Sequence, residues 1–299
     1  MSKATAAMRA RIRRRQRIRR LTILITIVII GVSLGVGIYL VSLASQATGL
    51  DRNINQTVSS SNLVALQRTS FQPYGPAPAA AMQSYVQKYG GTPFTANGKP
   101  LVVFVGGEFC QFCAIERWAI VMTLMRFGNF TSLHYMTAAT NEGDYATYTF
   151  VGSSYSSNYI AFRAYEAEDR DRNQLQTVPS NYSAVWSHFG SGFPFIDFGN
   201  TYVIPSSVLA SPSLLAGKNW TQIISGISTS DDAGLQIREA TNLFTALICK
   251  VTQGSPADVC SASPIGSIIT SIAGPAAMGS AVELFGVQVR TWRPPQVNV

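Results

Sequence analysis

The chain has 299 residues, enough for one ordinary domain with appendages, and a formal net charge of +8. Nine of its 23 basic residues lie within the first 20 positions, so the rest of the chain carries 14 basic and 15 acidic residues. The positive charge therefore belongs to a short N-terminal tail and not to a folded surface. This distribution excludes a nucleic-acid-binding domain.

An uncharged, strongly apolar segment follows the tail. Residues 21–43 (LTILITIVIIGVSLGVGIYLVSL) are long enough to cross a hydrocarbon core of ~30 Å as a helix. The apolar part of a cleaved signal peptide is shorter, on the order of 7–15 residues. We therefore expect a retained transmembrane helix, with cleavage after the small residues Ser45 and Ala47 as the alternative.

The flanking charge predicts the orientation of this helix. Because the arginine-rich tail, residues 1–20, lies on the N-terminal side, we expect it in the cytoplasm and the rest of the chain outside the cell membrane. Gly31 and Gly35 form a GxxxG pattern through which two such anchors can pair, so a homodimer is one expectation for the assembly.

The chain after the anchor consists of three segments that differ in composition. Residues 44–91 are rich in Ser, Gln, Asn and Ala and include the run QPYGPAP, which predicts a stalk or linker. Residues 92–272 are expected to form one compact domain. Residues 273–299 form a C-terminal extension that is rich in Gly and Ala at its start and has no assigned role.

The first half of the expected domain alternates between strand and helix patterns. The continuous apolar run 101–105 is typical of a strand that is buried on both faces. Residues 114–127 are apolar around most of a helical surface and stop at Gly128, which predicts a buried helix with a glycine at its C-terminal end. A second strand is expected at residues 133–137.

The second half of the domain adds further strands. Residues 145–151 and 159–165 predict strands inserted into the basic arrangement. Two apolar segments within residues 193–204 flank Gly199 and Asn200, a pair that suits a tight turn, so a hairpin is expected there.

A closing helix is expected after the hairpin. Thr229 and Asp232 have the spacing of a capping box, which predicts the start of this helix. Its apolar stripe consists of Leu243, Phe244, Leu247 and Ile248. The whole order of strand, helix, strand, hairpin and helix predicts an α/β fold, preceded by one N-terminal transmembrane helix.

Two cysteines lie where the first strand gives way to the buried helix. Cys110 and Cys113 enclose Gln111 and Phe112 in a CxxC pattern. A thiol at a helix N-terminus faces unpaired backbone N–H groups and the positive end of the helix dipole, which favour the thiolate. Because the thiolate is the species that attacks disulfides, this position predicts thiol–disulfide exchange chemistry.

The surrounding residues resemble known families. The segment VFVGGEFCQFC (residues 103–113) is similar to the active-site strand and turn of the thioredoxin superfamily, and GFPFID (192–197) resembles that superfamily's cis-proline segment. More narrowly, GEFCQFCAIERWA (107–119), TFVGS (149–153) and FPFID (193–197) resemble the uncharacterised domain-of-unknown-function family 929 of archaea and some bacteria. The resemblance implies a thioredoxin-like fold with inserted strands but no established substrate.

The resemblance also implies roles for single residues. Cys110 would be the nucleophile and Cys113 the resolving thiol, while Phe193 and the cis-proline Pro194 would border the substrate groove. The buried acid of thioredoxin would fall at Phe104, so this aid to proton transfer is missing from the expected position. The direction of the reaction stays open.

Other uses of the four cysteines remain as alternatives. Cys110 and Cys113 could form a disulfide that only stabilises the turn. Cys249 and Cys260 are expected to form a structural disulfide in an oxidising exterior, with a second redox pair as the alternative. Their separation does not suit a four-cysteine zinc site, so no metal and no cofactor are expected.

Other ionisable residues give weaker signals. Glu116 and Arg117 follow Cys113 closely and either tune its pKa or form ordinary ion pairs. The two histidines, His134 and His188, have no metal-ligand or catalytic-triad spacing.

The main hypothesis is a membrane-anchored, extracytoplasmic thiol–disulfide oxidoreductase. Its partners would be protein thiols and disulfides, together with a redox partner that the sequence does not identify. The alternative is a non-catalytic, thioredoxin-like envelope module for binding or assembly, stabilised by structural disulfides.

Overall fold

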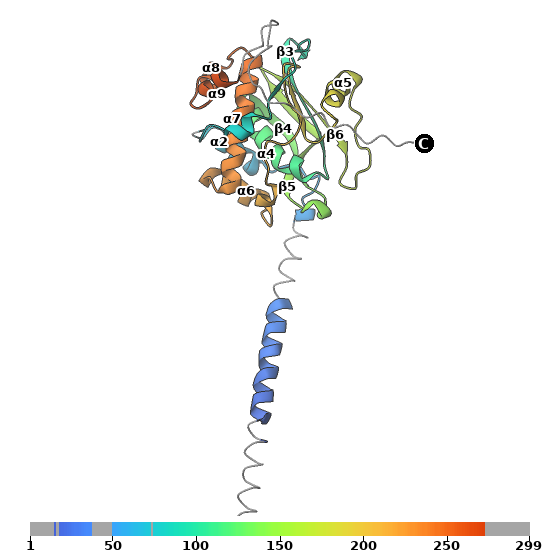
Figure 1. Ribbon diagram of the computed structural model, residues 1–299, viewed down its shortest axis with the longest axis vertical. Coiled ribbons are helices and arrows are strands. Elements are labelled where there is room, and N and C mark those ends of the chain that lie inside the picture. Colours follow the sequence, from blue (N-terminus) through green and yellow to red (C-terminus); the bar gives the residue numbers. More distant parts are fainter. Residues whose placement is uncertain (1–14, 16–17, 38–49, 73, 273–299) are drawn as a thin grey trace, which may run out of the picture.

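The computed structural model describes residue 15 and residues 18–37, 50–72 and 74–272 (Figure 1). Ile18–Gly37 form a 20-residue helix with a mean hydropathy of 2.1, which is long and apolar enough to cross a membrane. Its large apolar side chains are exposed and have no packing partner among the described residues. Most of the basic tail, the last part of the expected anchor and the C-terminal extension lie outside the described residues.

The described residues fold into a mixed α/β structure with two sheets. The larger sheet contains β1, β8, β7, β3 and β2 in that order, with β6 paired to β3, and the smaller sheet consists of β4 and β5. The strands are β1 (Gln87–Lys88), β2 (Thr95–Ala96), β3 (Lys99–Gly107), β4 (Gly128–Thr137), β5 (Ala146–Ser157), β6 (Ala161–Glu168), β7 (Phe195–Phe198) and β8 (Tyr202–Ile204).

Helices cover both faces of the larger sheet (Figure 1). The α-helices of the folded part are α2 (Ser60–Ser70), α3 (Ala80–Gln83), α4 (Gln111–Met125), α5 (Ser180–His188), α6 (Trp220–Thr229), α7 (Asp232–Val251), α8 (Ala257–Cys260) and α9 (Ile265–Ser271). Two short 3₁₀ helices, η1 (Thr140–Glu142) and η2 (Pro212–Leu215), lie in connecting segments.

Strand β3 is the centre of the larger sheet. It pairs in parallel with β6, from Leu101 opposite Ala161 onward, and antiparallel with β7 on its other side. The sequence prediction placed the second strand at residues 133–137, but these residues belong to β4, which pairs with β5 in the separate sheet. β4 and β5 follow each other closely and satisfy each other's backbone groups, so the next strand, β6, takes the place beside β3.

The alternation of side chains along β3 separates two cores. Leu101, Val103 and Val105 face a cluster on the α5 side of the sheet, whereas Val102 and Phe104 face the larger cluster that α4 and α7 cover. Successive side chains of a strand point to opposite faces, so a strand between two helical layers is apolar at every position. This arrangement explains the continuous apolar run predicted as a fully buried strand.

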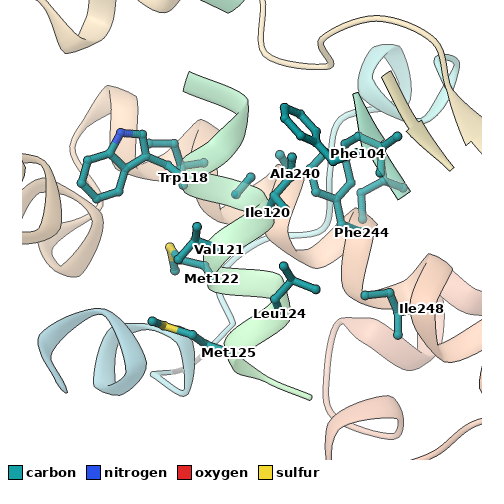
Figure 2. Packing of buried hydrophobic residues seen from close by; sticks show 14 of the residues in the cluster. Phe104, Trp118, Ile120, Val121, Met122, Leu124, Met125, Ala240, Phe244 and Ile248 are labelled. Atoms are coloured by element: carbon teal, nitrogen blue, oxygen red, sulfur yellow. The ribbon is translucent and has the colours of Figure 1, made fainter. Parts of the chain in front are cut away.

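Helix α4 lies inside the larger core. Thirteen of its 15 residues are buried, so almost its whole circumference contacts other elements. Figure 2 shows Ile120 and Leu124 of α4 beside Phe244 of α7. The predicted stripe of α7, including Leu243 and Leu247, is buried in the same cluster, which confirms that prediction.

The start of α7 differs from the predicted capping box. Asp231 is the N-cap, and its Oδ1 accepts a hydrogen bond of 2.7 Å from the Gly234 backbone N–H. Thr229 instead ends α6. A complete capping box is present at the start of α6, between Asn219 and Gln222. The spacing of Thr229 and Asp232 matches a capping box by chance, since Thr229 ends one helix and Asp232 begins the next.

Part of the expected stalk is packed into the core. Leu66 of α2 is fully buried, and α2 packs against α4 and α6. The buried hydroxyls of Thr69 and Ser70 donate hydrogen bonds of 2.8 Å to carbonyl oxygens one turn earlier in the same helix. The expectation of a stalk over residues 44–91 is therefore wrong for α2, because a polar composition concealed a helix whose hydroxyls are satisfied internally.

Candidate active site

Cys110 lies three residues beyond the end of β3, as the N-cap of α4. Its backbone is extended, and its Sγ accepts a hydrogen bond of 3.2 Å from the Cys113 backbone N–H. The sulfur is therefore the N-cap of a 15-residue helix. Unpaired N–H groups and the positive end of the helix dipole stabilise negative charge at this place.

The two thiols have different environments. Cys110 retains 7% exposure, whereas Cys113 is completely buried. The hydrogen bond with the Cys113 side chain and the Cys113 backbone N–H lower the pKa of Cys110, although burial opposes them. Burial raises the pKa of Cys113 well above its ordinary value. The geometry thus favours a thiolate at Cys110 and a protonated thiol at Cys113.

A buried ion pair lies behind the start of this helix. The Arg117 Nε and Nη2 atoms donate hydrogen bonds of 3.0 and 2.6 Å to the two carboxylate oxygens of Glu166 on β6. Arg117 Nη2 also donates to the Gly107 carbonyl oxygen at 2.8 Å. Burial opposes the guanidinium charge, but the Glu166 carboxylate outweighs it and raises the pKa of Arg117. Arg117 in turn helps to lower the pKa of Cys110.

Glu116 has a separate environment from its neighbour in the sequence. Its side chain is fully buried, and its Oε2 lies 2.6 Å from the Ser207 hydroxyl. Its Oε1 accepts a longer hydrogen bond of 3.4 Å from the Val208 backbone N–H. Burial raises the pKa of Glu116 to about 8, and the neighbouring Cys110 adds to this rise.

Glu108, two residues before Cys110 in the sequence, is a third buried carboxyl group in this region. It accepts a hydrogen bond of 2.6 Å from the Thr149 hydroxyl. Burial raises the pKa of Glu108, and the Thr149 hydrogen bond opposes this rise. Glu108 also lines a pocket of about 660 Å³, whose wall includes Ala139, Arg170 and Arg172.

Aromatic side chains surround the thiol pair. Phe109 and Phe193 meet edge to face with their ring centroids 6.1 Å apart, and Phe193 packs against the buried cluster that contains both cysteines. Trp186 of α5 stacks on Phe193 at 5.4 Å. The Arg172 guanidinium lies 3.7 Å from the centre of the Phe109 ring, a cation–π distance.

Phe193 and Pro194 are joined by a cis peptide bond immediately before β7. Trp186, Phe193 and Arg172 line a second pocket of about 380 Å³. Arg172 is therefore part of the walls of both pockets near the thiols. The structure places Phe193 against the buried cluster that contains Cys110 and Cys113, and its position at the border of a substrate groove stays a prediction.

The remaining cysteines and the histidines lie elsewhere. Cys249 and Cys260 form a disulfide between α7 and α8. His134 is hydrogen-bonded to the Val151 carbonyl oxygen, and His188 packs against Phe189. Within the part of the chain that the structure describes, no group of three or more His, Cys, Asp or Glu side chains is placed to hold a metal ion.

Sequence reasoning did not identify three residues that shape the site. Glu166 lies just after the expected strand 159–165, Arg172 lies in a polar stretch, and Ser207 lies in a Ser/Pro-rich loop. Each is far from the CxxC motif in sequence and reaches it through the fold. No local signal marked Glu166, because β6 also carries Arg163 and Glu168 and is mostly half-buried.

Comparisons with known proteins agree with the narrower of the two resemblances. The family model described as Domain of unknown function (DUF929) matches residues 85–182, which include the CxxC motif. The match covers β1 to the beginning of α5 and ends before Phe193 and Pro194. No curated protein and no solved structure matches the chain. The chain is thus similar to an uncharacterised family over one third of its length.

Proposed function

We propose that this protein is a membrane-anchored thiol–disulfide oxidoreductase in which Cys110 is the nucleophile and Cys113 the resolving thiol. The observation that carries the proposal is the asymmetry of the pair. Cys110 caps a helix and has a lowered pKa, whereas Cys113 is completely buried and has a raised pKa. A stabilised thiolate beside a protonated thiol is the starting state that disulfide exchange requires.

The reaction follows from this arrangement. The Cys110 thiolate attacks one sulfur of a substrate disulfide, which forms a mixed disulfide and releases the first substrate thiolate. Cys113 then attacks the Cys110 sulfur, so the Cys110–Cys113 bond forms and the second substrate thiolate leaves. Two electrons pass from the pair to the substrate, and both leaving thiolates are protonated. A dithiol donor reduces the pair again, and substrate thiols drive the reverse sequence when the pair starts oxidised.

The order of elements supports a thioredoxin-like fold for this site. The strand before the motif, β3, has the parallel strand β6 on one side and the antiparallel hairpin of β7 and β8 on the other. Helix α4 follows the motif, α7 covers the same face as α4, and the β4–β5 hairpin is the inserted element. This order supports the thioredoxin-like arrangement that the resemblance implies, with the difference that β6 and not residues 133–137 lies beside β3.

The surface near the thiols is suited to polypeptide substrates. Phe193 and Trp186 offer an apolar contact beside the pair, and both line one of the two pockets whose walls include Arg172. Protein thiols and disulfides are therefore the proposed substrates, with Phe193 and Pro194 at the border of their binding groove.

The site is proposed to lie outside the cytoplasmic membrane. The apolar helix Ile18–Gly37 supplies an anchor, and the basic tail before it favours a cytoplasmic N-terminus. The Cys249–Cys260 disulfide is independent support, because such bonds persist in oxidising compartments. A membrane-impermeant protease added to intact cells should digest the folded part only if this orientation is correct.

Three variants test the proposed exchange chemistry. Full-length protein in detergent is reduced and mixed with oxidised glutathione. Cys110→Ser should lose exchange, whereas Cys113→Ser should accumulate a glutathione adduct on Cys110. A variant lacking the other two cysteines, Cys249→Ala with Cys260→Ala, serves as the matched control and should still react. Unchanged exchange by Cys110→Ser would refute the proposal.

The reduction potential separates catalysis from the non-catalytic alternative. Equilibration of the Cys110–Cys113 couple against glutathione buffers should give a value between about −120 and −270 mV, the range of known exchange proteins. A value well below about −300 mV is typical of structural disulfides. That result would favour a binding or assembly module that uses the same scaffold without catalysis.

A further inference from the structure

In the resolving step the Cys113 thiol has to lose its proton, so a group that accepts this proton is needed. Cys113 attacks as a thiolate, yet it is fully buried and its pKa is raised well above the ordinary value. The proton of Cys113 therefore needs an acceptor inside the protein. The acid that would serve in thioredoxin is replaced by Phe104, whose ring is buried in the core.

Glu116 is placed to accept this proton. It follows Cys113 by three residues on α4, so the two side chains lie on the same helix face with Cβ atoms ~5–6 Å apart. Glu166 is a poorer acceptor because Arg117 holds its carboxylate with two hydrogen bonds.

Ser207 lets the Glu116 carboxyl group exist with or without its proton. The Ser207 Oγ lies 2.6 Å from Glu116 Oε2 and 3.0 Å from the Leu209 carbonyl oxygen. The hydroxyl donates to Glu116 when the carboxylate is charged. When Glu116 is protonated it donates to Ser207, whose own proton then turns to Leu209. Both states of the buried group are hydrogen-bonded, which avoids the cost of an unpaired buried polar atom.

Ser207 also connects Glu116 with solvent. Glu116 is fully buried, but Ser207 is half-buried in the loop between β8 and η2. A proton on Glu116 can therefore leave through Ser207 without passing through the apolar core. The group has the three properties of a relay: proximity to the thiol, two satisfied protonation states and an outlet.

The state of Cys110 links this relay to the catalytic cycle. A thiolate at Cys110 is one cause of the raised pKa of Glu116, after burial. Formation of the mixed disulfide removes the negative charge on Cys110, so Glu116 then releases its proton more easily. Glu116 thereby becomes a base at the stage when Cys113 has to lose its proton.

We propose that Glu116 accepts the proton of Cys113 as Cys113 closes the disulfide, and that Ser207 passes this proton to solvent. The Cys113–Cys110 bond forms, the bond from Cys110 to the substrate sulfur breaks, and the substrate leaves as a thiolate. The proton of Cys113 moves to Glu116 and then outward. This inference deepens the proposed function and rests on it.

The test separates the two chemical steps in the full-length protein. Stopped-flow mixing of reduced protein with a peptide disulfide that releases a coloured thiol at each step measures both rates between pH 6 and pH 9. Glu116→Gln should leave the first release within about twofold of wild type. It should slow the second release by on the order of 10²-fold, since general acid–base catalysis contributes on the order of 10²–10⁴-fold. It should also remove the pH inflection of this release, which we expect below the pKa of about 8 that Glu116 has beside the Cys110 thiolate, because Cys110 carries no charge in the mixed disulfide.

Controls distinguish this outcome from a loss of structure. Asp197→Asn changes another buried carboxyl group, on β7, and should leave both releases unchanged. Ser207→Ala keeps Glu116 but removes the outlet, and should slow the second release in the same pH-dependent way. This variant also keeps the test decisive if Glu116→Gln does not fold.

Two results would overturn the inference, and they are distinguishable. A second release that keeps its wild-type rate and pH profile in both Glu116→Gln and Ser207→Ala would exclude the relay while the oxidoreductase proposal stands. A wild-type protein that shows no first release would refute the oxidoreductase proposal itself, and the relay with it.

Discussion

The Arg117 guanidinium and the Glu166 carboxylate form a doubly hydrogen-bonded ion pair in which neither side chain has any exposure to solvent. The pair joins α4 to β6, the two elements on either side of the inserted hairpin. It also fixes the start of α4 through the hydrogen bond from Arg117 to the Gly107 carbonyl oxygen. The same interaction therefore holds the fold together and places a positive charge behind Cys110.

Glu166→Gln should affect both stability and reactivity. Removal of one partner leaves a buried charge without compensation, which costs ~3–5 kcal/mol of unfolding free energy. The uncompensated Arg117 charge should also lower the pKa of Cys110 further, so the midpoint of its alkylation by iodoacetamide should move to lower pH. Urea unfolding and pH-dependent labelling measure the two effects.

The matched control for this variant is a surface ion pair. The Nη2 atom of Arg172 lies 2.6 Å from Oε1 of Glu142, and the two side chains are 50% and 20% exposed. Glu142→Gln should change the unfolding free energy by less than ~1 kcal/mol, because exposed pairs contribute little. Equal losses in Glu166→Gln and Glu142→Gln would contradict the importance assigned to the buried pair.

Arg126 holds the N-terminal segment against the domain and should be sensitive to replacement. Its guanidinium donates hydrogen bonds to the Ser70 carbonyl oxygen at 3.0 Å, Asn242 Oδ1 at 3.0 Å and Thr245 Oγ1 at 2.9 Å. It also lies 4.0 Å from the centre of the Tyr74 ring. Arg126→Met leaves these buried acceptors unpaired, and each such loss costs ~1–3 kcal/mol.

We expect Arg126→Met to lower the unfolding free energy by ~3 kcal/mol or more and to expose residues 60–76 to limited proteolysis. Arg68, in the last turn of α2, is a control for loss of a basic residue in the same region. Arg68→Met should leave both stability and proteolysis close to wild type. Protection of the segment in Arg126→Met would show that α2 is held by its apolar contacts alone.

Local patterns in the sequence predicted the elements of the site, but not the way they pair. The run 101–105 and the CxxC motif specify a buried strand and a helix start because both signals lie within a few neighbouring residues. The strand that pairs with β3 is decided by contacts between residues far apart in the sequence. Because residues 133–137 pair with β5, it is β6 and not this segment that lies beside β3. Glu166 and Ser207 reach the site through this same long-range arrangement, which no local periodicity encodes.

Loss of the Cys249–Cys260 disulfide should destabilise the protein without changing exchange. The bond closes a short loop, with a sequence separation of 11, between α7 and α8. On the loop-entropy model such a closure stabilises the folded state by ~3 kcal/mol. The variant Cys249→Ala with Cys260→Ala should therefore unfold at a lower denaturant concentration.

Reduction of the wild type provides the internal control for this prediction. Unfolding in the presence of dithiothreitol should bring the wild type to the stability of the double variant measured under the same reducing conditions. A wild-type protein that is insensitive to dithiothreitol after complete reduction, shown by thiol counting, would mean that packing of the two buried cysteines provides the stabilisation.

Asp197 should make the protein less stable as the pH rises. Its Oδ1 accepts a hydrogen bond from the Asn200 backbone N–H, but Oδ2 is buried with no hydrogen-bond partner among the described residues. Burial raises the pKa of Asp197 to about 7, whereas the unfolded chain has an ordinary value of ~3.9. Between these two values the folded state holds a proton that the unfolded state has released. Stability therefore falls as the pH rises through this window and stays low above it.

Asp197→Asn removes this penalty because the amide is neutral at every pH and keeps an acceptor for the Asn200 N–H. The variant should match the wild type near pH 4 and exceed its unfolding free energy at pH 8 by up to ~4 kcal/mol. Asp169 is the opposite case, since the backbone N–H of Asn173 lowers its pKa and Asp169→Asn should lose stability at pH 8. Urea unfolding at both pH values decides the matter: no gain for Asp197→Asn at pH 8 would mean that the carboxylate is solvated in the folded protein.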